Sequence, residues 1–411
     1  MDKGIINISN IINNENILIY FQPIISVKKR SIIGFEALCR GLNTRTKKII
    51  SPDILFEFAR HENINVDLDR LCRKKALEFY RSTYSEKNNY ILFLNIDTSI
   101  IDNGVVGSGY LLNQVNNLGV DSNNIVIEIV ESKVQDIKSL DNFINFYKER
   151  GFLTALDDIG SGYSNLDRVA LVKPDILKVD KGIISNIDKL FYKQEIFKSL
   201  VNLSKKIGAL VVAEGVEREE EAIVTLELGA DMLQGFYFSE PRDNTSDMAE
   251  KTEKNIFHIA NKFNNYMTNK IKATKLMHKE YNAVLSSIIY ELSNVTFEYF
   301  DHMISEIIQK YTIIECIYII NEDGIQVTET FCNQVKIMKN GKIYGPAKKG
   351  TGHSLKDYYY YLISTGSKRF TTDPYVSLAS GNLCITISSQ FKDVNSNRFI
   401  LCIDIRQDAR Q

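Results

Sequence analysis

Residues 153–162 read Leu-Thr-Ala-Leu-Asp-Asp-Ile-Gly-Ser-Gly, a short apolar run that closes on two adjacent carboxylates, Asp157 and Asp158. Other strand-like segments before residue 240 also end in a polar side chain: Glu36, Asn95, Glu128, Lys178, Glu214 and Gln234. Active sites of (β/α)8 barrels lie where the strands end, so these side chains would meet in one mouth. The pattern predicts a metal enzyme built on a barrel.

The first two strand-like segments, residues 17–26 and 31–40, are separated only by Val27-Lys28-Lys29-Arg30. A parallel pair needs a crossover of a dozen or more residues, so these two strands must form an antiparallel hairpin. Strands then alternate with helices. We expect strands at 90–96, 125–130, 153–158, 175–179, 210–214 and 231–236, and helices at 52–61, 140–149, 190–207 and 217–228. The predicted fold of residues 1–243 is α/β, a modified TIM (β/α)8 barrel with an antiparallel first strand.

The rest of the chain predicts two further parts. Residues 244–312 carry apolar residues at helical spacing without proline, which indicates a helical linker. Residues 313–411 contain alternating strand patterns around a tyrosine-rich helix at 354–364, which indicates a smaller α+β domain with mostly antiparallel strands. The linker has more apolar surface than a tether needs, so we expect a homodimer.

Composition excludes several classes of protein. Lys and Arg (50) nearly balance Asp and Glu (51), so no bulk positive field exists to hold a long nucleic acid. The six cysteines lack C-x-x-C spacing, and in a chain of 411 residues they are expected to be reduced thiols. Apolar stretches fall short of the roughly 20 residues that span a bilayer, and the N-terminus does not resemble a secretory signal. We expect a cytoplasmic protein without a membrane span.

The oxygen-rich strand ends suit hard divalent cations. Such ions prefer carboxylates, carboxamides and water, and a pair of them can clamp the attacking and leaving oxygens of a phosphoryl transfer. Glu36, Asn95, Glu128 and Asp157 could form one site. Asp157 could bridge to a second ion completed by Asp158, provided that the strand breaks; residues 159–162, Ile-Gly-Ser-Gly, are expected to provide the break.

Lys178 leaves two hypotheses open. In a dry pocket it could form a Schiff base, as in aldolases. Among this many carboxylates it would instead keep its charge and orient a metal-bound water or a phosphate, which we favour. Glu214 is a candidate general base for such a water. The alternative role of an acidic residue favouring the following helix fits Glu217 better.

At this point the motifs resemble a known family, the EAL domain of bacterial cyclic di-GMP phosphodiesterases. The resemblance covers about residues 15–242 and is carried by Phe21-Gln22-Pro23-Ile24, Glu36-Ala37-Leu38-Cys39-Arg40, Leu94-Asn95-Ile96, Glu128-Ile129-Val130-Glu131, Asp157-Asp158-Ile159-Gly160-Ser161-Gly162-Tyr163-Ser164, Leu177-Lys178-Val179-Asp180, Ala213-Glu214-Gly215-Val216-Glu217 and Gln234-Gly235-Phe236. Cys39, Ile159 and Ser161 depart from the usual Leu, Phe and Thr, and none of these changes removes a ligand. A Gly-Gly-Asp-Glu-Phe cyclase motif is absent, so dinucleotide synthesis is not expected.

The resemblance implies a role for each matching residue. Glu36, Asn95, Glu128 and Asp157 would bind the first metal, and Asp157 and Asp158 the second, as Mg²⁺ or Mn²⁺, with Ca²⁺ inhibitory. Lys178 would hold the catalytic water and Glu214 would be the base. Substrate contacts would come from Gln22, Leu38 and Arg40, with Gln234 completing the site. Glu131 and Glu217 would stabilise the loops after Asp158 and Glu214.

The C-terminal part more loosely resembles PAS-like or Cache-like sensory domains, through Gly352-His353-Ser354-Leu355, residues 357–361, Asp373-Pro374-Tyr375-Val376-Ser377 and Cys384-Ile385-Thr386-Ile387. Such domains bind an unknown small ligand or only dimerise.

Three functions follow: a phosphodiesterase that opens cyclic di-GMP to linear pGpG under C-terminal control; a catalytically silent cyclic di-GMP receptor; and, least favoured, the Lys178 aldolase. Receptors of this fold commonly lose part of the carboxylate set, and this chain keeps it, so we favour the phosphodiesterase.

Overall fold

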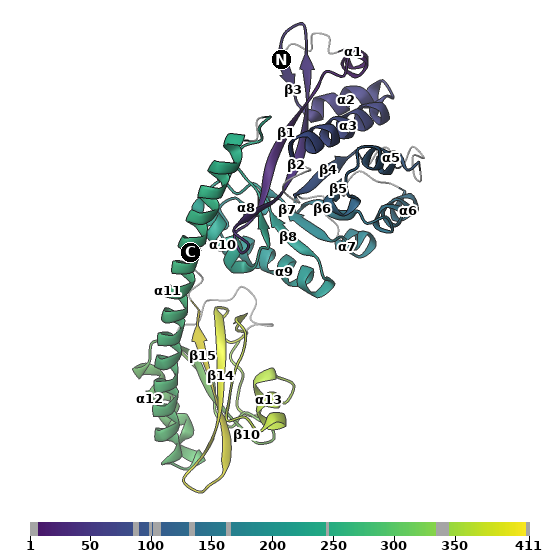
Figure 1. Cartoon of the computed structure of the whole chain (residues 1–411). Coiled ribbons are helices and arrows are strands. Elements are labelled where there is room, and N and C mark those ends of the chain that lie inside the picture. Colours follow the sequence, from purple (N-terminus) through teal and green to yellow (C-terminus); the bar gives the residue numbers. More distant parts are fainter. Residues whose placement is uncertain are drawn as a thin grey trace. The chain divides into compact units, whose positions relative to one another are not determined.

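The computed structural model describes residues 7–84, 90–97, 101, 108–130, 136–161, 166–243, 246–333 and 345–407. The chain divides into two compact units, Met1–Thr268 and Asn269–Gln411. The first unit contains a closed barrel surrounded by helices, and the second contains a separate antiparallel sheet (Figure 1). Within the described residues, no helix is both long and apolar enough to span a bilayer.

The barrel strands confirm the predicted fold class. They are β1 (Ile17–Ser26), β2 (Ser31–Asn43), β4 (Ile91–Ile96), β5 (Ile125–Val130), β6 (Leu153–Ile159), β7 (Ile176–Val179), β8 (Leu210–Ala213) and β9 (Met232–Leu233). Neighbours pair in parallel from β2 through β4 to β9, whereas β1 is antiparallel to both β2 and β9 and closes the ring. A short strand, β3 (Lys48–Ile50), extends β2 outside the ring.

The helices of the first unit pack around the strands. They are α1 (Ile8–Asn13), α2 (Pro52–His61), α3 (Asn65–Tyr84), α5 (Tyr110–Asn117), α6 (Ile137–Lys148), α7 (Leu166–Val172), α8 (Lys181–Ile184), α9 (Phe191–Ile207) and α10 (Glu219–Leu228). Helix α2 begins at Pro52, where the fixed backbone angle of proline suits the first helical position. Helix α9 ends at Gly208, which adopts the left-handed conformation that favours glycine.

Two apolar layers support the barrel. The layer between strands and helices forms the larger core. A smaller cluster fills the interior of the barrel and consists of Ile24, Phe93, Val126, Ala155, Ile176, Val212 and Met232. Each of these seven interior residues lies two positions from a predicted site residue, for example Val126 before Glu128. Because side chains alternate with a period of two along a strand, this spacing places the site residues directly on top of the apolar interior.

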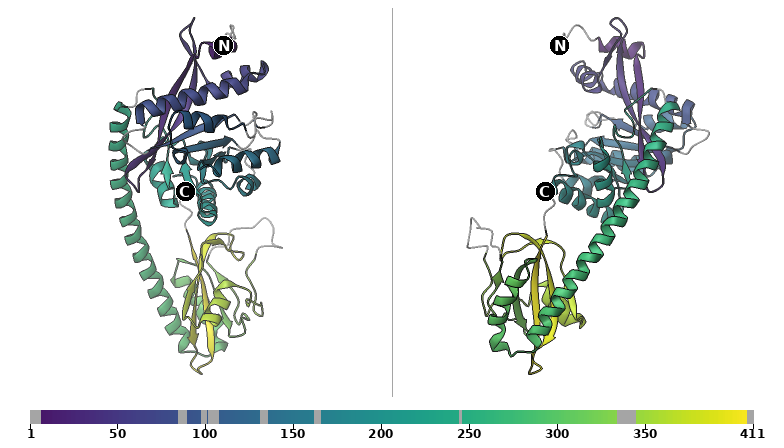
Figure 2. Two further views of the ribbon diagram at one scale, coloured as in Figure 1. Left: turned by 45° about the vertical axis from the view of Figure 1, so that its right-hand side comes forward. Right: turned by 90° about the vertical axis from the view of Figure 1, so that its left-hand side faces the viewer.

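A single helix, α11 (Ser246–Ser293), runs from the first unit into the second (Figure 2). Its residues contain neither proline nor glycine, so nothing in the sequence interrupts it. Ile256 and Ile259 belong to the barrel core, whereas Leu285 and Ile288 belong to the core of the second unit. The helix therefore contributes to two separate cores.

The second unit is built on a sheet of β10 (Ile314–Asn321), β11 (Phe331–Cys332), β12 (Arg369–Thr371), β13 (Tyr375–Val376), β14 (Leu383–Lys392) and β15 (Arg398–Arg406). Within the described residues, the named strands of this sheet pair antiparallel, as expected. Helices α11 and α12 (Phe300–Lys310) supply the apolar residues on one face, and α13 (Asp357–Thr365) packs on the other.

One expectation about the cysteines is wrong. Cys316 on β10 and Cys332 on β11 form a disulfide, so these two are not reduced thiols. The two residues are direct cross-strand partners in an antiparallel pair, which brings their Cα atoms close enough to bridge. Their separation of 16 residues gave no local signal in the sequence. Cys39, Cys72, Cys384 and Cys402 are free.

Candidate active site

Lys178 stands at the centre of the barrel mouth and contacts four carboxylates. Its Nζ lies 2.5 Å from Glu128 Oε1, 2.6 Å from Glu214 Oε1, and 3.3 Å from both Glu36 Oε2 and Asp157 Oδ1. These groups come from β2, β5, β6, β7 and the residue after β8, so five of the eight strands in the ring contribute. Only 1% of the surface of Lys178 is exposed.

The charges in this cluster shift one another's protonation. Burial lowers the pKa of Lys178, but the surrounding carboxylates outweigh burial and hold it well above its usual value. A lysine that stays charged cannot act as the free amine that a Schiff base requires, so the geometry argues against the aldolase hypothesis. Burial raises the pKa of Glu128 and of Glu214 well above their usual values, and it also raises that of Asp157.

Glu36 differs from the other carboxylates because two amides hold its anionic form. Asn95 Nδ2 donates to Glu36 Oε1 at 2.8 Å, and Gln234 Nε2 donates to Glu36 Oε2 at 2.7 Å. Burial raises the pKa of Glu36, but Lys178 and these two amides together bring it below its usual value. Gln22, opposite Glu36 in the hairpin register, accepts a second contact from Gln234 Nε2 at 3.1 Å.

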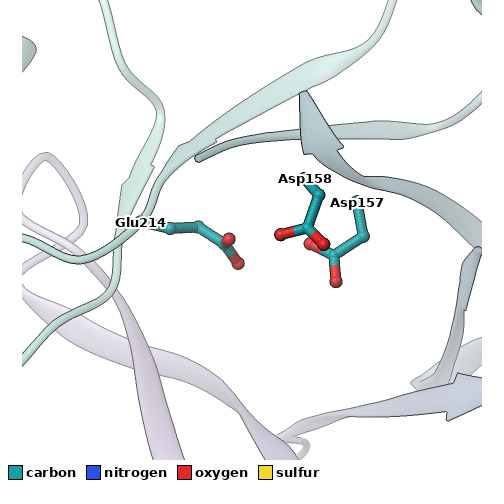
Figure 3. A group of neighbouring side chains, drawn as sticks. All are labelled: Asp157, Asp158 and Glu214. Atoms are coloured by element: carbon teal, nitrogen blue, oxygen red, sulfur yellow. The ribbon is translucent and has the colours of Figure 1, made fainter. Parts of the chain in front are cut away.

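Asp157 and Asp158 both reach the mouth although they are adjacent in sequence. Figure 3 shows their carboxylates side by side and facing Glu214. One oxygen from each of these three residues lies within 4.8 Å of the others. Asp158 adopts a left-handed backbone with φ of 58°, and the pairing of β6 with β7 shifts register between Leu156 and Ile159. This bulge changes the direction of the Asp158 side chain, so that it also points into the mouth.

The position of that break corrects an expectation. Residues 159–162 were expected to break the strand, but β6 continues through Ile159 and the irregularity lies at Asp158 itself. Asp is among the few residues with a side chain that tolerates the left-handed region, which is why the break can fall on the functional residue. Burial, together with the charge of Asp157, raises the pKa of Asp158 to about 6.

The donor set fits divalent cations. Lys178 Nζ faces Glu128 Oε1 at 2.5 Å and Asp157 Oδ1 at 3.3 Å, but among the described residues no hydrogen-bond donor reaches the buried Glu128 Oε2 or Gln234 Oε1. A buried oxygen without a donor is costly unless a cation compensates it. Three clustered carboxylates with a nearby carboxamide are the oxygen ligands that Mg²⁺ and Mn²⁺ prefer. The residues present therefore suit a site for such ions.

Two cavities open beside the cluster, and Glu36 lines both. The larger, about 530 Å³, also contacts Leu38, Asn95, Asp157 and Asp158. The smaller, about 180 Å³, is lined by Gln22, Lys181, Glu214, Glu217 and Gln234 among others. Four of the five predicted metal residues thus line a cavity, whereas Glu128 lines neither of these two.

Three predicted residues lie elsewhere or carry other contacts. Arg40 does not line either cavity; its Nη1 donates to the carbonyl of Cys39 at 2.8 Å, and its guanidinium lies over the Tyr20 ring. Glu217 lines the smaller cavity and forms an ion pair with Lys181. Glu131 lies outside the described residues.

Sequence reasoning missed Glu221, which fixes the loop after Glu214. Its Oε2 accepts from the backbone N–H groups of Glu217 and Arg218, both at 3.1 Å, and its Oε1 accepts from the N–H of Asn186 at 2.9 Å. Only 3% of its surface is exposed. The signal was available, because a glutamate at the third position of a helix is the acidic member of a capping box.

It also missed a buried ion pair on α3, a helix that lies next to the larger cavity. Arg73 and Asp69 pair there, and both residues line the cavity. Asp69 Oδ1 accepts from the backbone N–H of Asp97 at 3.1 Å, which ties α3 to the segment after Asn95. From the sequence alone, such a pair cannot be distinguished from two charged residues on the exposed face of a helix.

The family assignment rests on a domain-wide match. Residues 7–241 match the model of the EAL domain, which is more than half of the chain. The chain belongs to the EAL domain family. Its EAL domain comprises the barrel, the Lys178 cluster and both adjoining cavities, and leaves the second unit outside the matched residues.

Curated relatives of this EAL protein differ in how much of their length it matches. It is 25% identical to the uncharacterized EAL-domain containing protein YkuI of Bacillus subtilis, over 93% of each chain. It is 27% identical to the probable cyclic di-GMP phosphodiesterase PdeB of Escherichia coli, over 58% of this chain and 46% of PdeB. The likeness to PdeB therefore concerns about half of each protein.

Solved structures agree with the fold. The crystal structure of YkuI in complex with substrate c-di-GMP and calcium has a TM-score of 0.78 to this chain at 22% identity, and the match covers 98% of this chain and 100% of YkuI. The manganese/cy-diGMP complex of BlrP1 from Klebsiella pneumoniae has a TM-score of 0.50 at 27% identity, over 55% of this chain and 56% of BlrP1. The YkuI likeness extends the shared fold to the second unit.

Proposed function

We propose that this EAL protein hydrolyses cyclic di-GMP to linear pGpG in the cytoplasm, using two Mg²⁺ or Mn²⁺ ions. The observation that carries the proposal is the complete carboxylate and amide set around Lys178, which lies where two cavities adjoin. Support also comes from the relatives named as cyclic di-GMP phosphodiesterases and from homologous structures with calcium or manganese and the dinucleotide.

Glu36, Asn95, Glu128 and Asp157 would hold the first ion, and Asp157 and Asp158 the second. When bound, such ions neutralise charge that develops on the phosphoryl group and lower the pKa of water. Water adds to one phosphorus of the substrate while the bond from that phosphorus to the ribose 3′ oxygen breaks, which leaves a 5′-phosphate. Gln22, Leu38 and Gln234 line the cavity walls and would contact the substrate there.

Lys178 and Glu214 have complementary tasks in this scheme. Glu214 lies at the edge of the cluster, with 16% of its side chain exposed, so it can take the proton that the attacking water loses. Burial raises the pKa of Glu214, which makes it a stronger base than an exposed carboxylate. Lys178 keeps its charge at 2.6 Å from Glu214 and orients that carboxylate.

A catalytically silent receptor is the alternative, and metal dependence separates the two. The purified full chain is incubated with cyclic di-GMP and Mg²⁺ or Mn²⁺, and pGpG is followed by chromatography. We expect product with either ion, none in EDTA, and little in Ca²⁺, which accepts a looser coordination geometry than Mg²⁺. Substrate that stays intact with metal-loaded, binding-competent protein would favour the receptor.

Substitutions should separate the two proposed metal positions. Because Asp157 would bridge both ions, Asp157→Asn should weaken Mn²⁺ binding by more than the roughly 10- to 100-fold typical of losing an outer-shell partner. Asp158→Asn should have a smaller effect, and Asn95→Ala should affect mainly the tighter of two binding steps. Calorimetry of metal binding checks the order. Equal and small effects for all three variants would contradict the two-metal scheme.

The assembly and its regulation are part of the same proposal. Exposed apolar side chains on α11, among them Phe257, Ile271, Leu276 and Tyr290, exceed what a plain connecting helix needs, and we propose a homodimer that uses this helix. A ligand of the C-terminal unit would then alter activity only through different affinity for two dimer arrangements. Light scattering of the full chain at micromolar concentration tests the dimer, and a monomer would contradict it.

A further inference from the structure

The sheet of the second unit has one apolar face, and its other face, called the polar face below, carries buried polar side chains beside a small apolar cluster with α13. Ile385 and Ile387 on β14, with Leu401 and Ile403 on β15, belong to the core that includes α11 and α12. The alternate positions of the same strands carry Thr386, Ser388, Cys402 and Asp404, all of them buried. Because side chains alternate along a strand, this second set points to the opposite face. A face built only for packing would be apolar there.

A cavity of about 780 Å³ lies on this polar face. Aromatic side chains contribute much of its wall, namely Tyr318, Tyr358, Phe370 and Tyr375. Its size is within the range of small-molecule sites, which are typically aromatic with a few placed polar groups. All of its lining residues belong to the second unit, so the cavity is independent of the barrel mouth.

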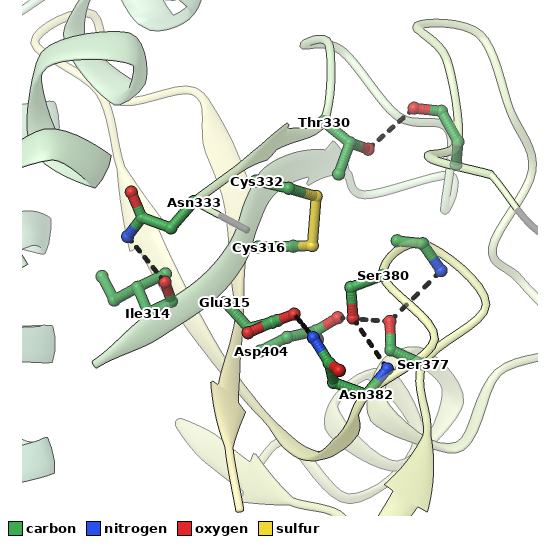
Figure 4. The surroundings of a disulfide bond; sticks show 12 residues. Ile314, Glu315, Cys316, Thr330, Cys332, Asn333, Ser377, Ser380, Asn382 and Asp404 are labelled. Carbon is green, nitrogen blue, oxygen red and sulfur yellow. Dashed lines mark hydrogen bonds between the residues drawn. A yellow bond between two sulfur atoms is a disulfide. The ribbon is translucent and has the colours of Figure 1, made fainter. Parts of the chain in front are cut away.

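Asp404 lines this cavity with 3% of its surface exposed and functions as an acceptor. Thr386 Oγ1 donates to Asp404 Oδ1 at 2.7 Å, and Ser377 Oγ donates to Oδ2 at 3.2 Å. Since the Thr386 hydroxyl uses its hydrogen there, Tyr375 must be the donor in its 2.6 Å contact with Thr386. These hydroxyl donors favour the carboxylate form, whereas burial, the larger effect, raises the pKa of Asp404 to about 6. Figure 4 shows Asp404 with Ser377 near the Cys316–Cys332 disulfide.

No described cation compensates this carboxylate. Lys, Arg and His side chains of the described residues form no ion pair with Asp404 or with the neighbouring buried Glu315, which accepts from the Asn382 amide. His353, also in the wall, is neutral: its Nε2 donates to Gln326 Oε1 at 2.8 Å and its Nδ1 accepts from Tyr358. Burial, with a smaller contribution from Lys356, lowers the pKa of His353 to about 4.

We propose that this cavity binds a small organic cation, a protonated amine or a quaternary ammonium compound, with its charge on Asp404 and its substituents against the tyrosine and phenylalanine rings. A buried carboxylate is costly without a cation, and aromatic faces attract ammonium groups. A small inorganic anion would meet Asp404, and among the described lining residues the one lysine, Lys356, is exposed and so offers no buried positive partner. A metal ion is less suitable, because the described three-residue carboxylate cluster is that of the barrel. The proposal does not depend on phosphodiesterase activity.

The test compares two probes of the same shape on the full chain. Choline carries the positive charge, and its carbon isostere, dimethylbutanol, does not. We expect choline or ethanolamine to bind by calorimetry and to raise the unfolding temperature, and dimethylbutanol to bind at least about tenfold more weakly, since only the cations are attracted to the Asp404 carboxylate and the aromatic faces. Equal binding of choline and dimethylbutanol, or no binding of either cation at millimolar concentration, would overturn the proposal.

Substitutions then locate the site. Asp404→Asn should weaken binding of the cation about tenfold or more and should also raise the unfolding temperature of the free protein, because it removes a buried uncompensated charge. A variant that is more stable but binds poorly cannot be explained by misfolding. Asp373→Asn is the matched control, since Asp373 lines the same cavity but is exposed. Equal losses in the two variants, or full affinity in Asp404→Asn, would contradict the assignment.

Discussion

Replacing Lys178 with methionine is expected to lower the free energy of unfolding by about 3–5 kcal/mol in EDTA, the cost of breaking a buried ion pair. Its Nζ lies within 3.3 Å of oxygens from Glu36, Glu128, Asp157 and Glu214. Without it, these carboxylates would face one another in a dry site. Added Mg²⁺ should restore part of the lost stability, because cations would replace the missing positive charge, but activity should stay lost.

Urea unfolding of wild type and variant, with EDTA and with Mg²⁺, measures this effect. Lys254→Met is the control: Lys254 pairs with a single carboxylate, Glu250, and 73% of its side chain is exposed. Exposed pairs of this kind typically contribute little to stability. If Lys178→Met costs no more than Lys254→Met, or if Mg²⁺ has no differential effect on it, the compensating role of Lys178 is contradicted.

The second large effect is expected for Glu214→Gln. The amide keeps the shape of the side chain but cannot accept a proton, so hydrolysis of cyclic di-GMP should fall by on the order of 10² or more while binding changes only a few-fold. Steady-state rates measure the loss of hydrolysis, and calorimetry measures the affinity for cyclic di-GMP. Glu220→Gln is the control, because Glu220 lies in the first turn of α10 with 62% of its side chain exposed. An unchanged rate in Glu214→Gln would show that another residue acts as the general base.

Most of what could be predicted from the sequence came from the polar residues at the ends of the strands. Period-two alternation put Glu128 and Lys178 on the same inward side as their apolar neighbours Val126 and Ile176, and the short link at residues 27–30 allowed only an antiparallel hairpin. The barrel with a reversed first strand was therefore predictable. The convergence of Lys178 with four carboxylates follows from the same alternation.

Other features depend on contacts that a sequence pattern does not encode. The left-handed backbone begins at Asp158 itself, where the pairing of β6 with β7 shifts register, and recurs at Gly160, where φ is 97°. The disulfide joins two cysteines that only strand pairing brings together. Asp404 is a single acidic residue in an apolar strand, and its role became visible only when the hydroxyls of Thr386 and Ser377 were placed beside it.

We propose that the cluster around Lys178 makes this chain a cyclic di-GMP phosphodiesterase and not only a receptor. The decisive experiment follows cyclic di-GMP and pGpG by chromatography in one sample of the full chain with Mn²⁺, beside Glu214→Gln at matched, saturating occupancy. We expect many turnovers to pGpG by wild type and intact, bound substrate in the variant. Intact, bound cyclic di-GMP in both samples would contradict it.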